Sequence, residues 1–127
     1  MSAQRQRLVL IVADDLGFVL WLGSKLQETG IGVLPAKEPS EAIQLLAQIN
    51  RKPDLLVIHL TASDASRANQ LIEGLPDMKV LALIGSDDQA YRMLSRVDAA
   101  VMRPYTVLEA SVVLQTIERL LTRHLTA

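Results

Sequence analysis

The sequence predicts an α/β fold built on an open, doubly wound parallel sheet. Short runs of consecutive apolar residues alternate with segments whose apolar residues recur at helical spacing, and this alternation repeats five times. The apolar runs are unbroken, which is typical of parallel strands buried on both faces. Connections are short and no linker divides the chain, so we expect a single domain over residues 1–127, with a core from 7 to 124.

Each strand is expected where an apolar run is bounded by polar or turn residues. The first run ends at the acidic pair Asp14 and Asp15, and it is too short for a signal peptide or a membrane span. The third run, DLLVIHL, contains His59 near its end. In order, the expected strands are residues 7–13, 31–35, 54–60, 79–84 and 99–102.

Each helix is expected from apolar periodicity and from signals at its ends. The first helix carries Val19, Leu22 and Leu26 on one stripe, with Gly30 just past its end. Pro39 stands at the first turn of the second helix. Two matches to the capping-box pattern open the fourth and fifth helices, Ser86 with Gln89 and Thr106 with Glu109. In order, the expected helices are residues 17–29, 39–50, 64–75, 86–96 and 106 onward, the last apolar at Val113, Ile117, Leu120 and Leu121.

Composition narrows the function classes. The 13 Lys and Arg against 14 Asp and Glu give a net charge of −1, which does not favour binding to nucleic acid through phosphate neutralisation. The chain has no Cys, so disulfides, thiolate metal sites and thiol nucleophiles are excluded, and we expect a cytoplasmic protein. No GxGxxG, P-loop, Ser-His-Asp or HExxH pattern is present, so we expect no enzyme and no nucleotide or flavin site.

Ligands of doubly wound sheets bind beyond the carboxyl ends of the strands, and three segments there resemble one family. These segments are VADD at 12–15, PDLLVIHL at 53–60 and VMRPY at 101–105. In order and spacing they resemble the receiver domain of bacterial response regulators, over residues 7–124. The resemblance implies a flavodoxin-like (βα)5 sheet with strand order 2-1-3-4-5 and a role in two-component or phosphorelay signalling.

The resemblance also implies a site, and this chain departs from it. In receivers, two acidic residues after strand one and an Asp ending strand three hold Mg²⁺, and that Asp accepts a phosphoryl group. Asp14 and Asp15 match the acidic pair, but His59 stands at the acceptor position. Three further positions depart from the family pattern. Ile84 replaces the hydroxyl residue, although Ser86 lies two residues on, and Ala100 replaces the aromatic switch. Arg103 replaces the Lys that precedes a proline, here Pro104, and in receivers this proline usually follows a cis bond.

These departures predict a degenerate receiver, or pseudo-receiver, that acts by protein binding. Imidazole cannot replace a carboxylate as the attacking oxygen or as a hard ligand of Mg²⁺. We therefore expect no cofactor, with at most a weak Mg²⁺ site at Asp14 and Asp15, a pair that Arg103 would otherwise neutralise. The alternative is a working phosphorelay receiver with an atypical acceptor, such as His59 or a nearby Asp.

Several other charged residues have both a functional and a structural interpretation. His59 is expected to form an ion pair or hydrogen bond, although a phosphohistidine or a pH-sensitive gate is also open. Asp87 and Asp88 could supply replacement ligands, but acidic residues near a helix start usually complement the helix dipole, and Asp64 has the same explanation. His124 is expected in the last helical turn, with no function implied.

Two surfaces are candidates for a protein partner, whether a kinase, an effector or another regulator. Leu20 and Trp21 lie off the buried stripe of the first helix and are expected to be at least partly exposed. Receivers also pair through their fourth helix, fifth strand and fifth helix, so a homodimer could form through the corresponding segments here. Neither surface predicts contact with nucleic acid or a membrane.

Overall fold

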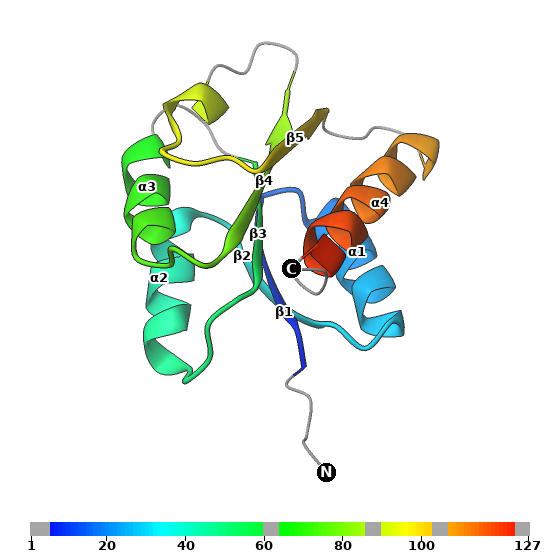
Figure 1. Cartoon of the computed structure of the whole chain (residues 1–127), viewed down its shortest axis with the longest axis horizontal. Helices are drawn as coiled ribbons and strands as arrows, with labels where there is room; N and C mark the ends of the chain where they lie inside the picture. The colour runs from blue at the N-terminus through cyan, green and yellow to red at the C-terminus, as the bar shows by residue number, and fades with distance from the viewer. Residues whose placement is uncertain (1–5, 60–63, 86–89, 103–106, 124–127) are drawn as a thin grey trace.

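Five parallel strands form one sheet in the order β2-β1-β3-β4-β5, as predicted. The computed structural model describes residues 6–59, 64–85, 90–102 and 107–123 (Figure 1). The strands are β1 (Leu8–Val12), β2 (Gly32–Ala36), β3 (Leu55–Ile58), β4 (Lys79–Ile84) and β5 (Ala99–Met102). Both the α/β class and the strand order are therefore confirmed.

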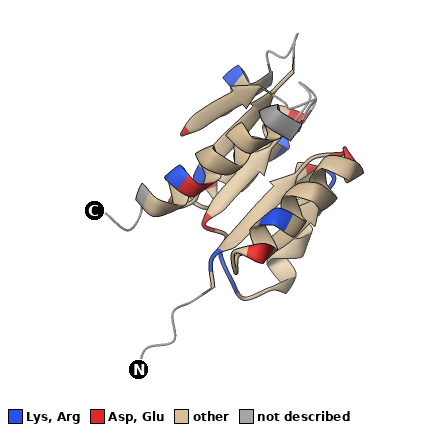
Figure 2. Cartoon of the chain, turned by 90° about the vertical axis from the view of Figure 1, so that its right-hand side faces the viewer, with Lys and Arg blue, Asp and Glu red and all other residues tan. Residues whose placement is uncertain are grey.

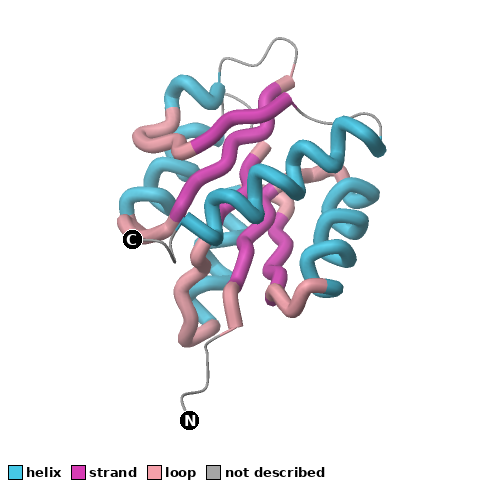
Figure 3. Tube along the Cα trace, turned by 45° about the vertical axis from the view of Figure 1, so that its right-hand side comes forward, coloured by secondary structure: helices cyan, strands magenta, loops and turns pink. Residues whose placement is uncertain are grey.

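Helices cover both faces of this sheet. They are α1 (Leu16–Glu28), α2 (Pro39–Gln48), α3 (Ala65–Glu73) and α4 (Val107–Arg123). Helices α1 and α4 lie against one face, and α2 and α3 lie against the other (Figures 1 and 3). No helix within the described ranges is long and apolar enough to cross a membrane.

Side chains alternate between two apolar cores, one on each face. In β1, Val9 and Ile11 point toward α1 and α4, whereas Leu10 and Val12 point toward α2 and α3. All five residues of β1 are buried, and so are all four of β3. This double burial explains why the strands read as unbroken apolar runs.

The helix expected over residues 86–96 is the main correction. Residues 86–89 lie outside the described residues, and those that follow form only a short 3₁₀ helix, η2 (Ala90–Met93). A continuing α-helix would join the Ser95 N–H to the Tyr91 carbonyl. Instead, Leu94 N donates to Tyr91 O at 3.2 Å, and Ser95 N donates to Asn69 Oδ1 at 2.7 Å.

Asn69 also explains where η2 ends. Its Nδ2 donates to the Met93 carbonyl oxygen at 2.8 Å, so one side chain of α3 occupies both the carbonyl and the N–H that further helical turns would use. A tertiary contact thus outweighs the local helix preference of this segment. Residues 106 and 124 lie outside the described residues, as do the side chains of Glu109 and Arg123, so the Thr106 capping box and His124 are not placed.

A candidate site at the carboxyl edge of the sheet

His59 lies directly after β3, at the edge where the parallel strands end. Its backbone N–H donates to the Val12 carbonyl oxygen at 2.9 Å, and Ala13 N donates in turn to Ala36 O at 3.0 Å. These bonds join the end of β1 to the ends of its two neighbours, β3 and β2. The imidazole is half-buried, so it is neither sealed in the core nor fully in solvent.

The acidic pair divides into two different environments. Asp14 is exposed, whereas Asp15 is half-buried and caps α1. Asp15 Oδ1 accepts the Phe18 N–H at 3.2 Å, and the Asp15 carbonyl oxygen accepts from Val19 N at 3.0 Å. One carboxylate oxygen of the pair is thus committed to the start of a helix.

The donor set at this edge does not suit a tight Mg²⁺ site. Mg²⁺ prefers near-octahedral oxygen coordination. Here one carboxylate caps a helix, the other is exposed, and the residue that follows β3 is a histidine, which offers no oxygen ligand. Among the residues that the structure describes, no group of three or more His, Cys, Asp or Glu side chains could hold a metal ion. A weak Mg²⁺ site at Asp14 and Asp15 stays a prediction.

A hollow of about 190 Å³ opens beside Asp14, between α1 and the end of β2. Leu16, Val19 and Pro35 contribute to its lining, and Lys37 and Glu41 add charge. Glu41 Oε1 accepts the Lys37 N–H at 2.9 Å. Lys37 and Glu41 were not among the predicted site residues, although Lys37 directly follows β2 and so lies at the edge where the other strands also end.

Ile84 and Ala100, which stand where receivers carry a hydroxyl residue and an aromatic switch, share one face of the sheet. Ile84 ends β4 and is half-buried, and its partner in β5 is Met102. Ala100 pairs with Ala82, two residues before Ile84, and is exposed. Ile84, Ala100 and Met102 therefore form an apolar strip.

The remaining predicted site residues are not placed. Arg103 and Pro104 lie outside the described residues, as do Ser86, Asp87 and Asp88. Asp64 is described, and it lies at the N-cap position of α3, as its helix-start interpretation predicts.

The first helix presents an apolar face to solvent. Leu16 and Leu20, one helical turn apart, are 66% and 63% exposed. Trp21 is half-buried, and its ring centroid lies 6.5 Å from that of Phe18. The prediction that Leu20 and Trp21 are at least partly exposed is confirmed.

Solved structures of receiver domains share this fold. A signal receiver domain of an HD domain-containing protein from Pseudomonas fluorescens Pf-5 matches with a TM-score of 0.79 and 18% identity, covering 97% of this chain and 100% of the other. A response regulator from Thermotoga maritima matches with a TM-score of 0.73 and 18% identity, over 93% and 99% of the two chains. The receiver domain of a signal transduction histidine kinase from Syntrophus aciditrophicus gives 0.72 and 22%, over 91% and 90%.

The sequence comparisons add nothing to this likeness. No protein-family model matches the chain, and no curated protein matches it. At these identities, the structural matches establish that the chain has the receiver fold.

Proposed function

We propose that this chain is a receiver-like signalling module of two-component type that works by binding a protein partner, without phosphorylation of an aspartate. The observation that carries the proposal is His59 at the end of β3, within a receiver fold. In that position the resemblance expects the phosphoryl-accepting carboxylate. Fold alone does not imply function, so the proposal depends on this site.

The chemistry of three positions supports it. An imidazole at position 59 supplies no carboxylate oxygen for attack and no hard oxygen ligand for Mg²⁺. Ile84 ends β4 with an aliphatic group that can donate no hydrogen bond to a phosphoryl oxygen. Ala100 has no ring whose rotation could report phosphorylation. The catalytic and the signalling parts of a conventional receiver are thus altered together.

Two apolar surfaces support partner binding. Leu16, which lines the hollow beside Asp14, and Leu20, one helical turn further on, are both exposed on α1. Exposed apolar side chains of this kind are typical of docking sites. Near the β5 edge of the sheet, Met102 of β5 and Val112 of α4 are also exposed. The first surface suits a kinase, effector or regulator, and the second corresponds to the segments through which a homodimer could form.

Acetyl phosphate tests the proposal directly. The protein is incubated with acetyl phosphate and Mg²⁺, then examined by intact mass spectrometry at neutral pH, because phosphohistidine is labile in acid. A receiver with an intact acceptor Asp, treated in parallel, serves as the positive control. We expect the control to gain one phosphoryl group and this protein to gain none.

The alternative, an atypical phosphorelay acceptor, predicts the opposite result. It requires a phosphoryl adduct on the wild-type chain. Loss of that adduct in His59→Ala would identify the imidazole as the acceptor, and its persistence would indicate another side chain. Either adduct contradicts the proposed phosphorylation-independent function.

A further inference from the structure

A larger cavity lies at the opposite edge of the sheet from His59, where the strands begin. It has a volume of about 450 Å³ and lies beside the last turn of α4, whose Leu120 and Leu121 contribute to its lining. Arg7, Lys52 and Lys79 bring three cationic side chains to it. Neither the receiver resemblance nor the proposed function uses this edge.

The sheet register explains why two of these cations face the cavity. Arg7 lies two residues before Val9, and Lys79 lies two residues before Leu81. Side chains two residues apart in a strand share a face, and Val9 and Leu81 both pack in the core under α1 and α4. Arg7 and Lys79 are therefore directed to the same side as the end of α4.

The cations have few anionic partners. Arg7 Nη1 donates to the Leu121 carbonyl oxygen at 2.6 Å, a contact that neutralises no formal charge. Among the residues that the structure describes, Lys52 and Lys79 form no ion pair. Cationic side chains thus outnumber carboxylates in the lining, and an excess of one sign in a partly enclosed space attracts a ligand of opposite sign more strongly than it would in open water.

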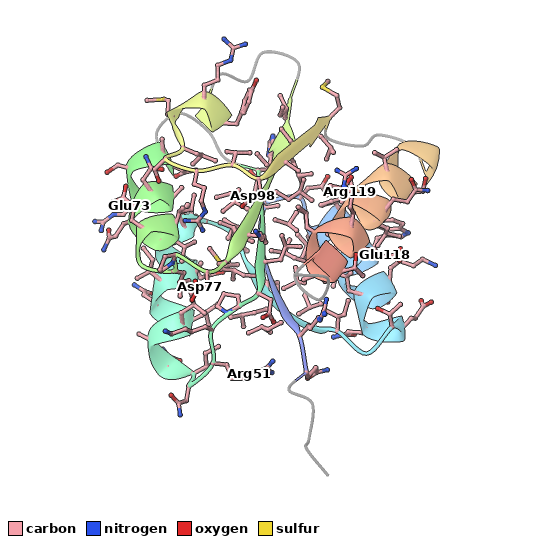
Figure 4. The ribbon with its side chains drawn as sticks, viewed as in Figure 1. Arg51, Glu73, Asp77, Asp98, Glu118 and Arg119 are labelled. Atoms are coloured by element: carbon pink, nitrogen blue, oxygen red, sulfur yellow. The ribbon has the colours of Figure 1, made fainter. Side chains whose placement is uncertain are left out.

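Two carboxylates also line the cavity, and they affect it unequally. Asp54 Oδ2 accepts the Leu8 N–H at 2.9 Å, so that oxygen is already engaged. Asp77 is exposed. In Figure 4, Asp77 and Arg51 lie toward this end of the sheet. In Figure 2, Lys and Arg positions are blue where the chain enters the sheet.

We propose that this cavity binds a small polyanion carrying two or more phosphoryl or carboxylate groups. Arg7 supplies a planar guanidinium with N–H donors beyond the one used by Leu121, a geometry that matches two oxygens of one anionic group. Lys52 and Lys79 supply point charges for a second group. Because Arg7 holds the last turn of α4, a bound anion would contact the residue that ties α4 to β1.

Titration calorimetry with two probes tests this proposal on the whole chain, in buffer without divalent cations. Pyrophosphate represents phosphoryl ligands and citrate represents carboxylates. We expect saturable binding of at least one probe, and the probe that binds more tightly identifies the preferred chemistry. If neither probe saturates, the proposal is overturned.

Matched variants separate a site from general charge attraction. Lys52→Gln combined with Lys79→Gln is expected to weaken binding by about tenfold or more, because two charge-assisted contacts are lost. Lys25→Gln combined with Lys37→Gln removes the same charge from α1 and the end of β2 and should leave affinity within about twofold. Equal losses in both double variants would overturn the proposal. Far-UV circular dichroism checks that each variant is folded.

Asp77→Asn provides a test in the opposite direction. Removing a negative charge from the lining of an anion site is expected to tighten binding by about threefold. Because Asp77 is exposed, this change should leave the fold intact. Weaker binding in Asp77→Asn would contradict an anion site, since it would show that the carboxylate itself contributes to binding.

Discussion

Two roles use the carboxylate oxygens of Asp15, namely capping of α1 and candidate metal binding. As the N-cap of α1 it accepts the Phe18 N–H through Oδ1, and as one of the acidic pair it is a candidate metal ligand. A carboxylate at a helix start is also stabilised by the helix dipole. The capping contact gives Asp15 a structural role that does not depend on whether any ion binds nearby.

Replacing Asp15 by Ala should therefore lower the free energy of unfolding by about 1 kcal/mol, the usual cost of losing an N-cap. Urea denaturation followed by circular dichroism measures this change. Asp14→Ala is the matched control, because Asp14 is exposed and does not cap the helix. If both variants lose the same stability, general electrostatics and not capping would explain the effect.

The proposal that His59 prevents tight binding of a divalent ion at this edge can be tested directly. We expect Mg²⁺ titration at millimolar concentrations to leave the fluorescence of Trp21 without a saturable change, since the third oxygen ligand is missing. Trp21 is a suitable reporter because it lies on α1, the helix that begins after Asp15. His59→Asp restores the carboxylate and should gain a saturable response. Tight saturation in the wild-type chain would contradict this account.

The positions of these residues could be predicted from the sequence, and two of their contacts had local signals. Asp14, Asp15 and His59 each follow an apolar run, and parallel strands end at one edge, so their position at that edge is a consequence of topology. That Asp15 would cap α1 had a local signal, since Asp is a favoured N-cap residue. The hydrogen bond from the Lys37 N–H to Glu41 also had a local signal, because it joins residues four apart and Glu41 lies in the first turn of α2.

Strands and helices differ in how well local pattern predicted them. Strands β4 and β5 have the predicted bounds, because each is an apolar run that polar or turn residues bound in the sequence. The segment before β5 was predicted to be a helix over residues 86–96, but its described part forms only the short η2. Its apolar spacing is compatible with a helix, but Asn69 of α3 takes the hydrogen-bonding groups that would extend it. A contact between residues so far apart in the chain leaves no trace in local periodicity.

Asn69→Ala tests this explanation of the short η2. Losing both amide contacts should lower the free energy of unfolding by about 1 kcal/mol and loosen the segment around Ser95. Hydrogen exchange at the Ser95 amide should accelerate, because its acceptor is removed. Gln70→Ala is the control on the same helix, since Gln70 contacts only Arg67 through its side chain among described residues. Unchanged exchange at Ser95 would show that Asn69 does not hold η2 in place.

The molecule has two apolar cores, one on each face of the same sheet. Leu10 and Val12 of β1 pack with α2 and α3, while Val9 and Ile11 of the same strand pack with α1 and α4. A strand cannot lose its packing on one face and keep its register undisturbed on the other. We therefore expect the two sides to unfold together as one cooperative unit.

Ile72→Ala measures this coupling, because Ile72 is fully buried on the face opposite Trp21. Truncating it should lower the free energy of unfolding by about 2–5 kcal/mol. If the sheet couples both cores, the midpoint in urea should fall equally by far-UV circular dichroism and by Trp21 fluorescence. Ile117→Ala, on the same side as Trp21, is the control and should behave alike. A Trp21 midpoint that Ile72→Ala leaves unchanged would show that the α1 and α4 side unfolds independently.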